Sequence, residues 1–176
     1  EELSSYLVEI TEACLRVKDP EDGSDLVEKI MDKAGQKGTG LWTVVSALEL
    51  GASVPTIYAS LNGRVMSSMK DQRNHAETIL NGLKPSIVDF GKPSEGMPLL
   101  MDAVILATIS SYAQGMDILR LASDEYNYDL TMPSIAQIWK GGCIIRSTLL
   151  SRIQDAFKND PKLRNLILDE WFTDQV

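Results

Sequence analysis

PLLMDAVILATISSYAQGMDILRLASDEYN, residues 98–127, is the stretch that decides the fold. Its apolar residues recur at the spacing of a helix. This pattern predicts one helix of roughly 30 residues, which at ~1.5 Å per residue is about 45 Å long. A helix of that length usually crosses the centre of a domain. The stretch therefore predicts a helical domain built around one long central helix.

The segments before this stretch have the same helical spacing of apolar residues. Near the N-terminus, one helical stripe is formed by Leu3, Leu7, Ile10 and Cys14. Residues 26–35, LVEKIMDKAG, are predicted to form a helix. Asp25 and Glu28 form an aspartate version of the capping box at its start. Gly35 is expected to end this helix as a left-handed C-cap.

Further helices are predicted over residues 43–51, 55–69, 70–83, 131–142, 143–159 and 161–172. Pro55 and Pro161 suit the start of their helices. Residues 82–96 carry Gly, Pro and Ser and form the least regular connection. The alternation of apolar and polar residues that marks a strand is missing from the sequence. We therefore expect an all-α fold, with residues 1–176 forming a single domain.

The composition argues against nucleic acids and membranes as binding partners. The 176 residues carry a formal net charge of −8, and the pI is near 4.7. Nucleic acids and anionic membranes bind clustered cations, so we expect neither as a partner. No apolar run is expected to reach the ~20 residues of a membrane helix, because Ser110, Ser111, Gln114, Asp117 and Arg120 interrupt the longest one. The first ten residues place no basic segment before an apolar one, so no signal peptide is expected.

The cysteines and the single histidine give little sign of special chemistry. Cys14 and Cys143 lie far apart and form no CxxC pair, which is typical of a reduced, intracellular protein. Both are predicted to be core cysteines. His75 lies in a polar stretch and is expected to be exposed. One histidine does not build a metal triad, so we expect no metal ligand.

The stretch AGQKGTGLW, residues 34–42, places a lysine among glycines. A Walker loop needs GxxxxGK followed by Ser or Thr, and a dinucleotide fingerprint needs a third glycine where Thr43 stands. Both motifs also need a preceding strand, so both nucleotide sites are excluded. Two interpretations remain open. The stretch is either an interhelix turn or an anion site at the N-terminus of a helix that begins near Trp42, where unsatisfied N–H groups attract negative charge.

The longer stretch IMDKAGQKGTGLW, residues 30–42, resembles the signature of the 6-phosphogluconate dehydrogenase family. That signature has an aliphatic residue, an aspartate two positions later, a glycine or alanine, a small polar residue, KGTG and a tryptophan. Five further segments resemble other blocks of the family, so the resemblance covers essentially the whole chain. They are LSSYLVEIT, VMSSMKDQR, ISSYAQGMDILRLAS with WKGGCIIRS, and NLILDEWF.

The resemblance implies an enzyme that oxidises and decarboxylates 6-phosphogluconate to ribulose 5-phosphate while reducing NADP, or NAD in some members. It implies a cytosolic homodimer, and it places residues 1–176 in the all-α C-terminal domain of the family. The Rossmann domain, the helix that carries the catalytic lysine and glutamate, and the C-terminal tail are expected to lie outside this chain. We therefore expect no catalytic and no cofactor-binding residue within it, and we expect the 176 residues alone to be inactive.

Three residues match substrate contacts of the family. The resemblance implies that Lys37, in the signature, contacts the substrate phosphate and that Arg64, in GRVMSSMKDQR, grips the same phosphate. Thr39 matches a signature threonine near it. A phosphate dianion suits guanidinium donors combined with an ammonium group. Asn62 and Gly63 stand where many family members have bulkier residues, a departure that bears on the packing just before Arg64.

Other residues are expected to have structural roles. Arg146 is expected to brace a helix, and Trp42 and Trp139 to pack against the core or an interface. The alternative to a substrate-binding piece of an enzyme is a purely structural helical dimerisation module that binds no ligand on its own.

Overall fold

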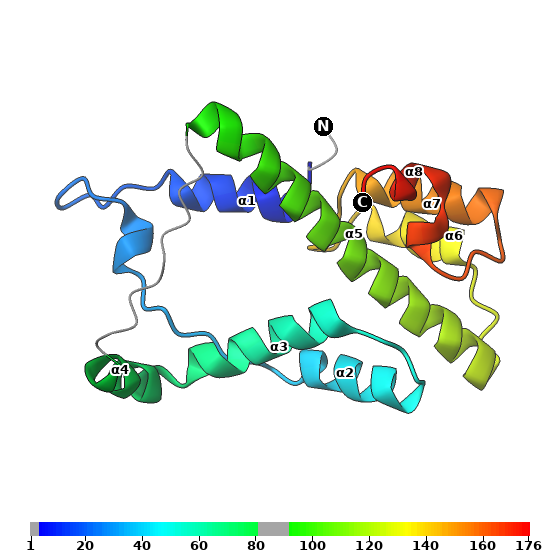
Figure 1. The fold of residues 1–176 in the computed structure, drawn as a ribbon, viewed down its shortest axis with the longest axis horizontal. Coiled ribbons are helices and arrows are strands. Elements are labelled where there is room, and N and C mark those ends of the chain that lie inside the picture. Colours follow the sequence, from blue (N-terminus) through cyan, green and yellow to red (C-terminus); the bar gives the residue numbers. More distant parts are fainter. Residues whose placement is uncertain (1–3, 81–91) are drawn as a thin grey trace.

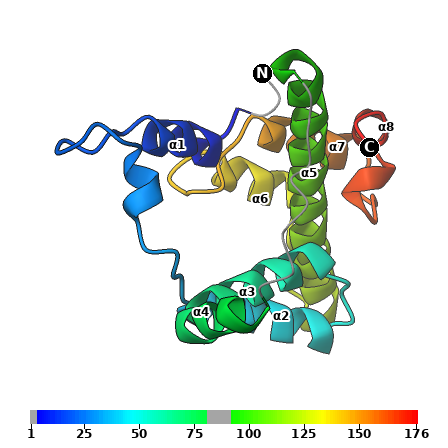
Figure 2. The same cartoon turned by 60° about the vertical axis from the view of Figure 1, so that its left-hand side comes forward.

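The computed structural model of the chain describes residues 4–80 and 92–176. The long central helix is present as α5 (Pro93–Tyr126), which has 34 residues and spans the molecule in Figures 1 and 2. It ends at Asn127, whose φ of 54° is left-handed and whose backbone N–H donates to the carbonyl of Ser123. Asparagine takes this conformation more readily than other non-glycine residues, so the end of the helix has a local cause.

The other elements in the described residues are also helical. They are α1 (Tyr6–Leu15), η1 (Leu26–Lys29), α2 (Thr39–Glu49), α3 (Pro55–Ser68), α4 (Lys70–Ile79), α6 (Met132–Trp139), α7 (Leu149–Asn159), η2 (Leu166–Leu168) and α8 (Glu170–Thr173), of which η1 and η2 are 3-10 turns. Over the same residues, β pairing is limited to two isolated bridges. The prediction of an all-α fold with one long central helix is confirmed.

The main core lies where α6, α7, η2 and α8 pack on the middle of α5 (Figure 1). Its buried members are Ile109, Ala113, Met116, Met132, Ala136, Leu149, Leu150, Ile153, Ala156, Phe157, Leu163, Leu166 and Phe172. Trp139 packs against this cluster, as expected. At about 25 cal/mol per Å² of buried apolar surface, each fully buried leucine, isoleucine, methionine or phenylalanine contributes roughly 1.5–3 kcal/mol.

A second, smaller cluster lies on the opposite face of α5. Ala47, Ala52 and Val54 are buried there, and Ile118 and Leu121 of α5 pack against them. At 100° per residue, Ile118 lies about 140–160° around the helix from Ala113 and Met116 of the main core. The central helix is therefore apolar on two faces because α2 and α3 cover one face and α6 and α7 the other.

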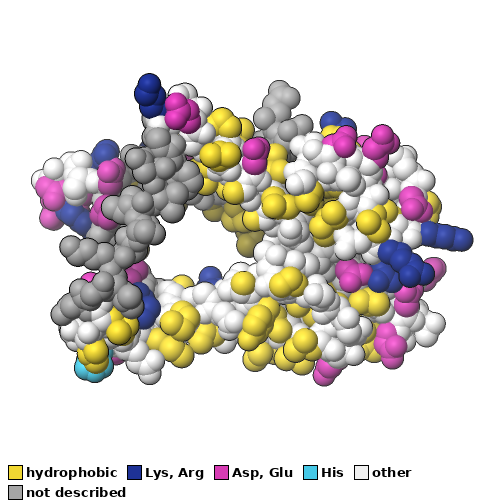
Figure 3. All heavy atoms as spheres, in the orientation of Figure 1, with side chains coloured by type: hydrophobic (Ala, Val, Ile, Leu, Met, Phe, Trp, Pro, Cys, Tyr) yellow, Lys and Arg dark blue, Asp and Glu magenta, His cyan; other side chains and the backbone are white. Residues whose placement is uncertain are grey.

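The chain is open rather than closely packed as a whole. Figure 3 shows an opening between the group formed by α2, α3 and α4 and the group formed by α1, α5 and α6–α8. A compact monomer of 19.4 kDa exposes about 8,500 Å², whereas this chain exposes 12654 Å². Apolar side chains contribute to the excess on the first half of α5, where Met97, Leu99, Leu100, Met101, Val104 and Leu106 are exposed.

The expectation that no segment has the length and composition of a membrane helix is wrong on those two criteria. Among the described residues, one helix, Ser94–Tyr126, has a window with a mean hydropathy of 1.4, and 17% of that window is buried. The serines and glutamine that interrupt the run lower its hydropathy less than charged residues do. Length and composition do not distinguish a membrane span from the central helix of a helical domain.

Residues 26–35 do not form the predicted helix. Only η1 is helical there, Asp25 makes no side-chain cap, and the chain is irregular from Met31 to Lys37. Gly35 has no positive φ, so the predicted left-handed C-cap is also wrong; the left-handed glycine of this stretch is Gly38, with a φ of 100°. The physical reason lies in long-range hydrogen bonds, because distant side chains bind the backbone of residues 32–35 in place of helical bonds.

The C-terminal third is broken into shorter pieces than predicted. The helix expected over 143–159 begins only at Leu149, since the backbone before it pairs with the N-terminal segment: Tyr6 donates to Arg146 and a bridge joins Ser5 to Ser147. The helix expected over 161–172 is replaced by η2 and α8. Asn165 and Asp169 cap these two turns with their side chains and thereby start each one anew.

The remaining expectations have mixed outcomes. α3 and α4 are confirmed, although residues 81–83 of the predicted 70–83 helix lie outside the described residues, and of the predicted connection 82–96 only the part from residue 92 is described. Arg146 braces a helix as expected, because its guanidinium lies 3.6 Å from the ring centroid of Tyr6 in α1. Cys143 is partly buried, but Cys14 is exposed rather than a core residue, because α1 has no buried residues.

Candidate functional site

The GTG sequence forms the start of α2. Gly38 is the N-cap residue, and its carbonyl accepts a hydrogen bond from the amide of Trp42 at 2.9 Å. Its φ of 100° suits glycine, because an L side chain rarely adopts that conformation. The helix begins at Thr39, three residues before the predicted start near Trp42. The first amides of α2 therefore belong to the KGTG segment itself, and amides at this position have no partner within a helix.

Gly40 allows α2 to approach α3 closely. A Cβ atom on Gly40 would lie 3.4 Å from Cδ1 of Leu61, a buried residue of α3. Arg64 follows Leu61 by three residues, which is nearly one helical turn, so the two side chains share a side of α3. The packing of Gly40 on Leu61 thus brings the beginning of α2 next to the helix that carries Arg64.

Arg64 contacts the stretch that leads into the signature lysine. Its Nε donates to the carbonyl oxygen of Gly35 at 2.8 Å, and Nη2 contacts the same oxygen. Lys37 is two residues further on, so its Cα lies within about 7 Å of the Cα of Gly35. Lys37, Thr39 and Arg64 are all exposed. The structure therefore brings the three predicted residues into one region at the N-terminus of α2.

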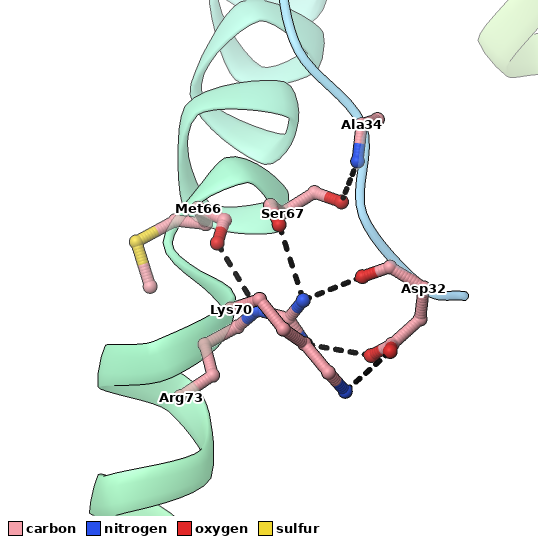
Figure 4. A network of polar contacts seen from close by, with 6 residues as sticks. All are labelled: Asp32, Ala34, Met66, Ser67, Lys70 and Arg73. Carbon is pink, nitrogen blue, oxygen red and sulfur yellow. Dashed lines mark hydrogen bonds and ion pairs between the residues drawn. The ribbon is translucent and has the colours of Figure 1, made fainter.

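Sequence reasoning did not find the ion pairs beside this region, which Figure 4 shows. Asp32 binds Arg73 at 2.8 Å and also pairs with Lys70, both of which lie on α4. The Arg73 guanidinium, followed by the Lys70 ammonium, holds the pKa of the Asp32 carboxyl well below its usual range. The sequence feature that indicates these ion pairs is the spacing of Lys70 and Arg73, which places two cations on one side of a helix.

A shallow surface pocket of about 520 Å³ lies at the same place. Its walls come from the stretch before the signature lysine and from the end of α3, and Arg73 closes one side. Its lining residues are Met31, Asp32, Lys33, Ala34, Gly63, Met66, Ser67 and Arg73. Gly63 is exposed there and a Cβ on it would meet nothing within 4 Å, so the missing side chain keeps the pocket open on that side.

His75 and Trp42, two other residues singled out in the sequence, both lie at the surface. His75 is exposed on α4, as expected. In the part of the chain that the structure describes, no group of three His, Cys, Asp or Glu side chains is arranged to hold a metal ion. Trp42 is 66% exposed and does not pack into the core, although Gly38 lies against its ring.

The chain is similar to known proteins over its whole length. A family model for the 6-phosphogluconate dehydrogenase C-terminal domain matches residues 1–176. The chain is 48% identical over 176 residues to a decarboxylating 6-phosphogluconate dehydrogenase of Synechocystis sp., covering 100% of this chain and 36% of the relative. It is 45% identical over 180 residues to the chloroplastic decarboxylating 6-phosphogluconate dehydrogenase 3 of Arabidopsis thaliana, covering 99% of this chain and 37% of that relative.

A solved structure has the same fold. It is 6-phosphogluconate dehydrogenase of Plasmodium falciparum, described in its apo form, in complex with its cofactor NADP+ and in complex with its substrate 6-phosphogluconate. The TM-score is 0.89 at 41% identity, covering 99% of this chain and 38% of that one. The chain thus spans little more than a third of the length of the proteins it matches. By its family match and these identities, it belongs to the 6-phosphogluconate dehydrogenase family, and residues 1–176 match the model of that family's C-terminal domain.

Proposed function

We propose that this chain works as part of an oxidoreductase that decarboxylates 6-phosphogluconate to ribulose 5-phosphate and reduces NADP. The observation that carries the proposal is the match to the family along the entire chain, with 48% identity to a protein named for this activity. The structure of the Plasmodium relative, described with NADP+ and with 6-phosphogluconate, supports the choice of cofactor and substrate. The contribution of this chain is a helical core and part of the substrate site.

Lys37, Thr39 and Arg64 form the proposed contact to the substrate phosphate. The first amides of α2 add N–H donors and the positive end of the helix dipole. The chain as a whole has a net charge of −8, so a phosphate dianion needs a local cluster of cations to be attracted. Each charge-assisted hydrogen bond to the phosphate would contribute about 1.5–3 kcal/mol.

The test is the pair of variants Lys37→Ala and Arg64→Ala in the enzyme that carries this chain. Loss of one such bond should raise KM for 6-phosphogluconate about tenfold or more, since about 1.4 kcal/mol corresponds to a factor of ten. KM for NADP should stay unchanged. The matched control is Lys158→Ala, which removes an exposed cation from α7. An unchanged KM for the sugar phosphate in both variants would show that Lys37 and Arg64 do not bind the substrate phosphate.

The alternative, a structural dimerisation module, is favoured by the exposed apolar surface. The chain exposes about 4,000 Å² more than a compact protein of its mass. Obligate homodimers bury about 2,000–5,000 Å² in total. The exposed apolar residues on the first half of α5 are suited to such an interface. We propose that a second copy of the chain covers this surface, which is compatible with a role in the substrate site.

The dimer is tested with Leu100→Glu, which places a charge on the exposed apolar side of α5. Sedimentation velocity at low protein concentration should show the unmodified protein as a dimer and the variant shifted towards monomer. Lys158→Glu on α7 is the control, because it changes the charge of an already polar surface. A variant that sediments like the unmodified protein would exclude this part of α5 from the interface.

The proposed location is the cytoplasm, with neither nucleic acid nor a membrane as partner. Support comes from the net charge of −8 and from two cysteines that are both free thiols. The relative named chloroplastic in Arabidopsis thaliana offers a different compartment. Cell fractionation followed by an antibody against the chain would separate the two locations.

A further inference from the structure

We propose that Asp32 is a positioning residue for the phosphate site: through Arg73 and Lys70 it fixes residues 32–35 on the end of α3 and so sets where Lys37 stands relative to Arg64. This inference rests on the proposed function of Lys37 and Arg64. It adds a residue that acts on the phosphate site through the backbone that leads to the signature lysine.

The first support is that Asp32 is held from two sides. Its Oδ2 binds Nη1 of Arg73 at 2.8 Å, and its Oδ1 binds Nζ of Lys70. Its backbone carbonyl accepts a further bond from Nη2 of Arg73 at 2.6 Å. Side chain and main chain of one residue are thus bound by the same guanidinium group, which fixes the orientation of both (Figure 4).

Arg73 also binds the end of α3. Its Nε donates to the carbonyl of Met66 at 3.1 Å, and its Nη2 donates to the carbonyl of Ser67 at 3.1 Å. These carbonyls lie in the last turn of α3, where carbonyls lack the usual partner four residues on and attract cations, although the Met66 carbonyl also accepts from the amide of Met69. Arg73 therefore connects Asp32 directly to the helix that carries Arg64, one turn before Ser67.

The stretch 32–35 has few other means of holding its place. It forms neither helix nor strand. The amide of Ala34 donates to Oγ of Ser67 at 2.9 Å, and the carbonyl of Gly35 accepts from Arg64. Every one of these attachments leads to residues 64–73, so the position of the stretch is defined relative to the end of α3 and the start of α4. Lys37 follows two residues later.

Because the Asp32 carboxylate is exposed, a role in positioning the phosphate site and a role in stabilising the fold predict different results for a variant at Asp32. The Asp32 side chain is 60% exposed, and exposed ion pairs contribute little to the free energy of folding. A small displacement of a binding group, in contrast, weakens substrate binding, because hydrogen bonds are confined to about 2.7–3.2 Å and loss of one charge-assisted bond weakens binding about tenfold or more. Loss of the Asp32 carboxylate is therefore expected to affect the phosphate site more than the melting temperature.

The experiment uses Asp32→Asn, which keeps the shape and removes the charge, in the enzyme that carries this chain. KM for 6-phosphogluconate should rise about tenfold, as for the loss of one charge-assisted hydrogen bond to the phosphate. Ki of gluconate, a competitor that has no phosphate group, should stay unchanged, as should KM for NADP. The melting temperature should fall by no more than about 4 °C. A rise of Ki for gluconate equal to that of KM would overturn the inference, because a general distortion affects both.

A second variant and a matched control complete the test. Arg73→Lys keeps the charge but loses the fork that joins Asp32 to the Met66 and Ser67 carbonyls, and it should raise KM in the same selective way. The control is Asp25→Asn. Its carboxylate is also half exposed and pairs with a lysine, Lys18, but it is not attached to α3. Asp25→Asn should leave KM and Ki unchanged.

A double-variant cycle separates this inference from the function on which it rests. If Asp32 acts through the phosphate contacts, adding Asp32→Asn to Arg64→Ala should raise KM by less than the product of the single effects. If Lys37→Ala and Arg64→Ala leave KM unchanged, the proposed phosphate site is wrong. If those two raise KM while Asp32→Asn and Arg73→Lys do not, the phosphate site stands and only the positioning role of Asp32 is refuted.

Discussion

The guanidinium group of Arg64 donates from Nε to the carbonyl oxygen of Gly35 across 2.8 Å, and Nη2 contacts the same oxygen. One edge of the Arg64 guanidinium thus holds the backbone before the signature lysine. Its remaining N–H donors stay available to bind an anion. A planar guanidinium can bind a carbonyl and a phosphate at once, whereas an ammonium on a flexible stem has no such fixed edges. Arg64 therefore has two tasks in the proposed site, and they call for an arginine specifically.

The first prediction concerns Arg64→Lys. This variant keeps the charge but loses the fixed fork, so it should behave nearly like Arg64→Ala. We expect KM for 6-phosphogluconate to rise about tenfold or more, because at least one charge-assisted hydrogen bond is lost. Steady-state kinetics at saturating NADP measures this. A KM equal to that of the unmodified enzyme would show that charge alone is enough and that the bond to Gly35 has no role in binding.

The second prediction compares two glycines. Gly38 has a φ of 100°, and a Cβ there would lie 3.4 Å from the ring of Trp42. Gly38→Ala should lower the free energy of unfolding by about 1–2 kcal/mol, the cost of a side chain in a left-handed conformation. Gly63 is in α3 with open space around it. Gly63→Ala should raise stability by up to ~1 kcal/mol through helix propensity. Urea unfolding of both variants measures this, and changes of the same sign would contradict the prediction.

Local patterns predicted the helices whose ends have local causes. The apolar spacing of residues 98–127 predicted α5, and Pro55 marked the start of α3. The resemblance to the family likewise pointed to Lys37 in the signature and to Arg64 in GRVMSSMKDQR. In contrast, residues 26–35 were predicted to form a helix but are irregular after η1, because Arg64, Ser67 and Arg73 bind the backbone of residues 32–35 from positions 29 to 41 residues away. No window of local sequence contains those partners.

The role of Asp32 was hidden for the same reason. Its position in the signature was visible in the sequence, but its partners Lys70 and Arg73 are 38 and 41 residues further along the chain. The exposure of Cys14 was also unpredictable, because a stripe of apolar residues indicates a helix but not whether another element covers it. In this structure, α1 has no buried residue even though its stripe is regular.

The third prediction concerns the core that holds the C-terminal turns on α5. Phe172 in α8 is fully buried in the main core and packs edge-on against Trp171 at 4.9 Å between ring centroids. Phe172→Ala should lower the free energy of unfolding by about 3–5 kcal/mol, the sum of lost burial and the cavity left behind. The control is Leu168→Ala in η2, where the side chain is 70% exposed and the expected change is within about 0.5 kcal/mol. Equal effects in thermal unfolding would contradict the placement of the core.

The last prediction is a pH dependence that arises in the loop before η1. Lys29 binds Asp22 at 2.8 Å and Asp19 at 2.6 Å, and its hydrogen bond, followed by those from Ser24, lowers the pKa of Asp22 from 3.8 to about 2. Because the pKa is lower in the folded state, the stabilisation from Asp22 is complete above the unfolded pKa and is lost as pH falls from 3.8 towards 2.

Lys29→Met removes the main cause, so the pKa of Asp22 should rise towards its ordinary value. The melting temperature of the unmodified protein should therefore fall more steeply below about pH 4 than that of Lys29→Met. The exposed Lys162→Met serves as control, and parallel curves for unmodified protein and Lys29→Met would disprove the assigned cause.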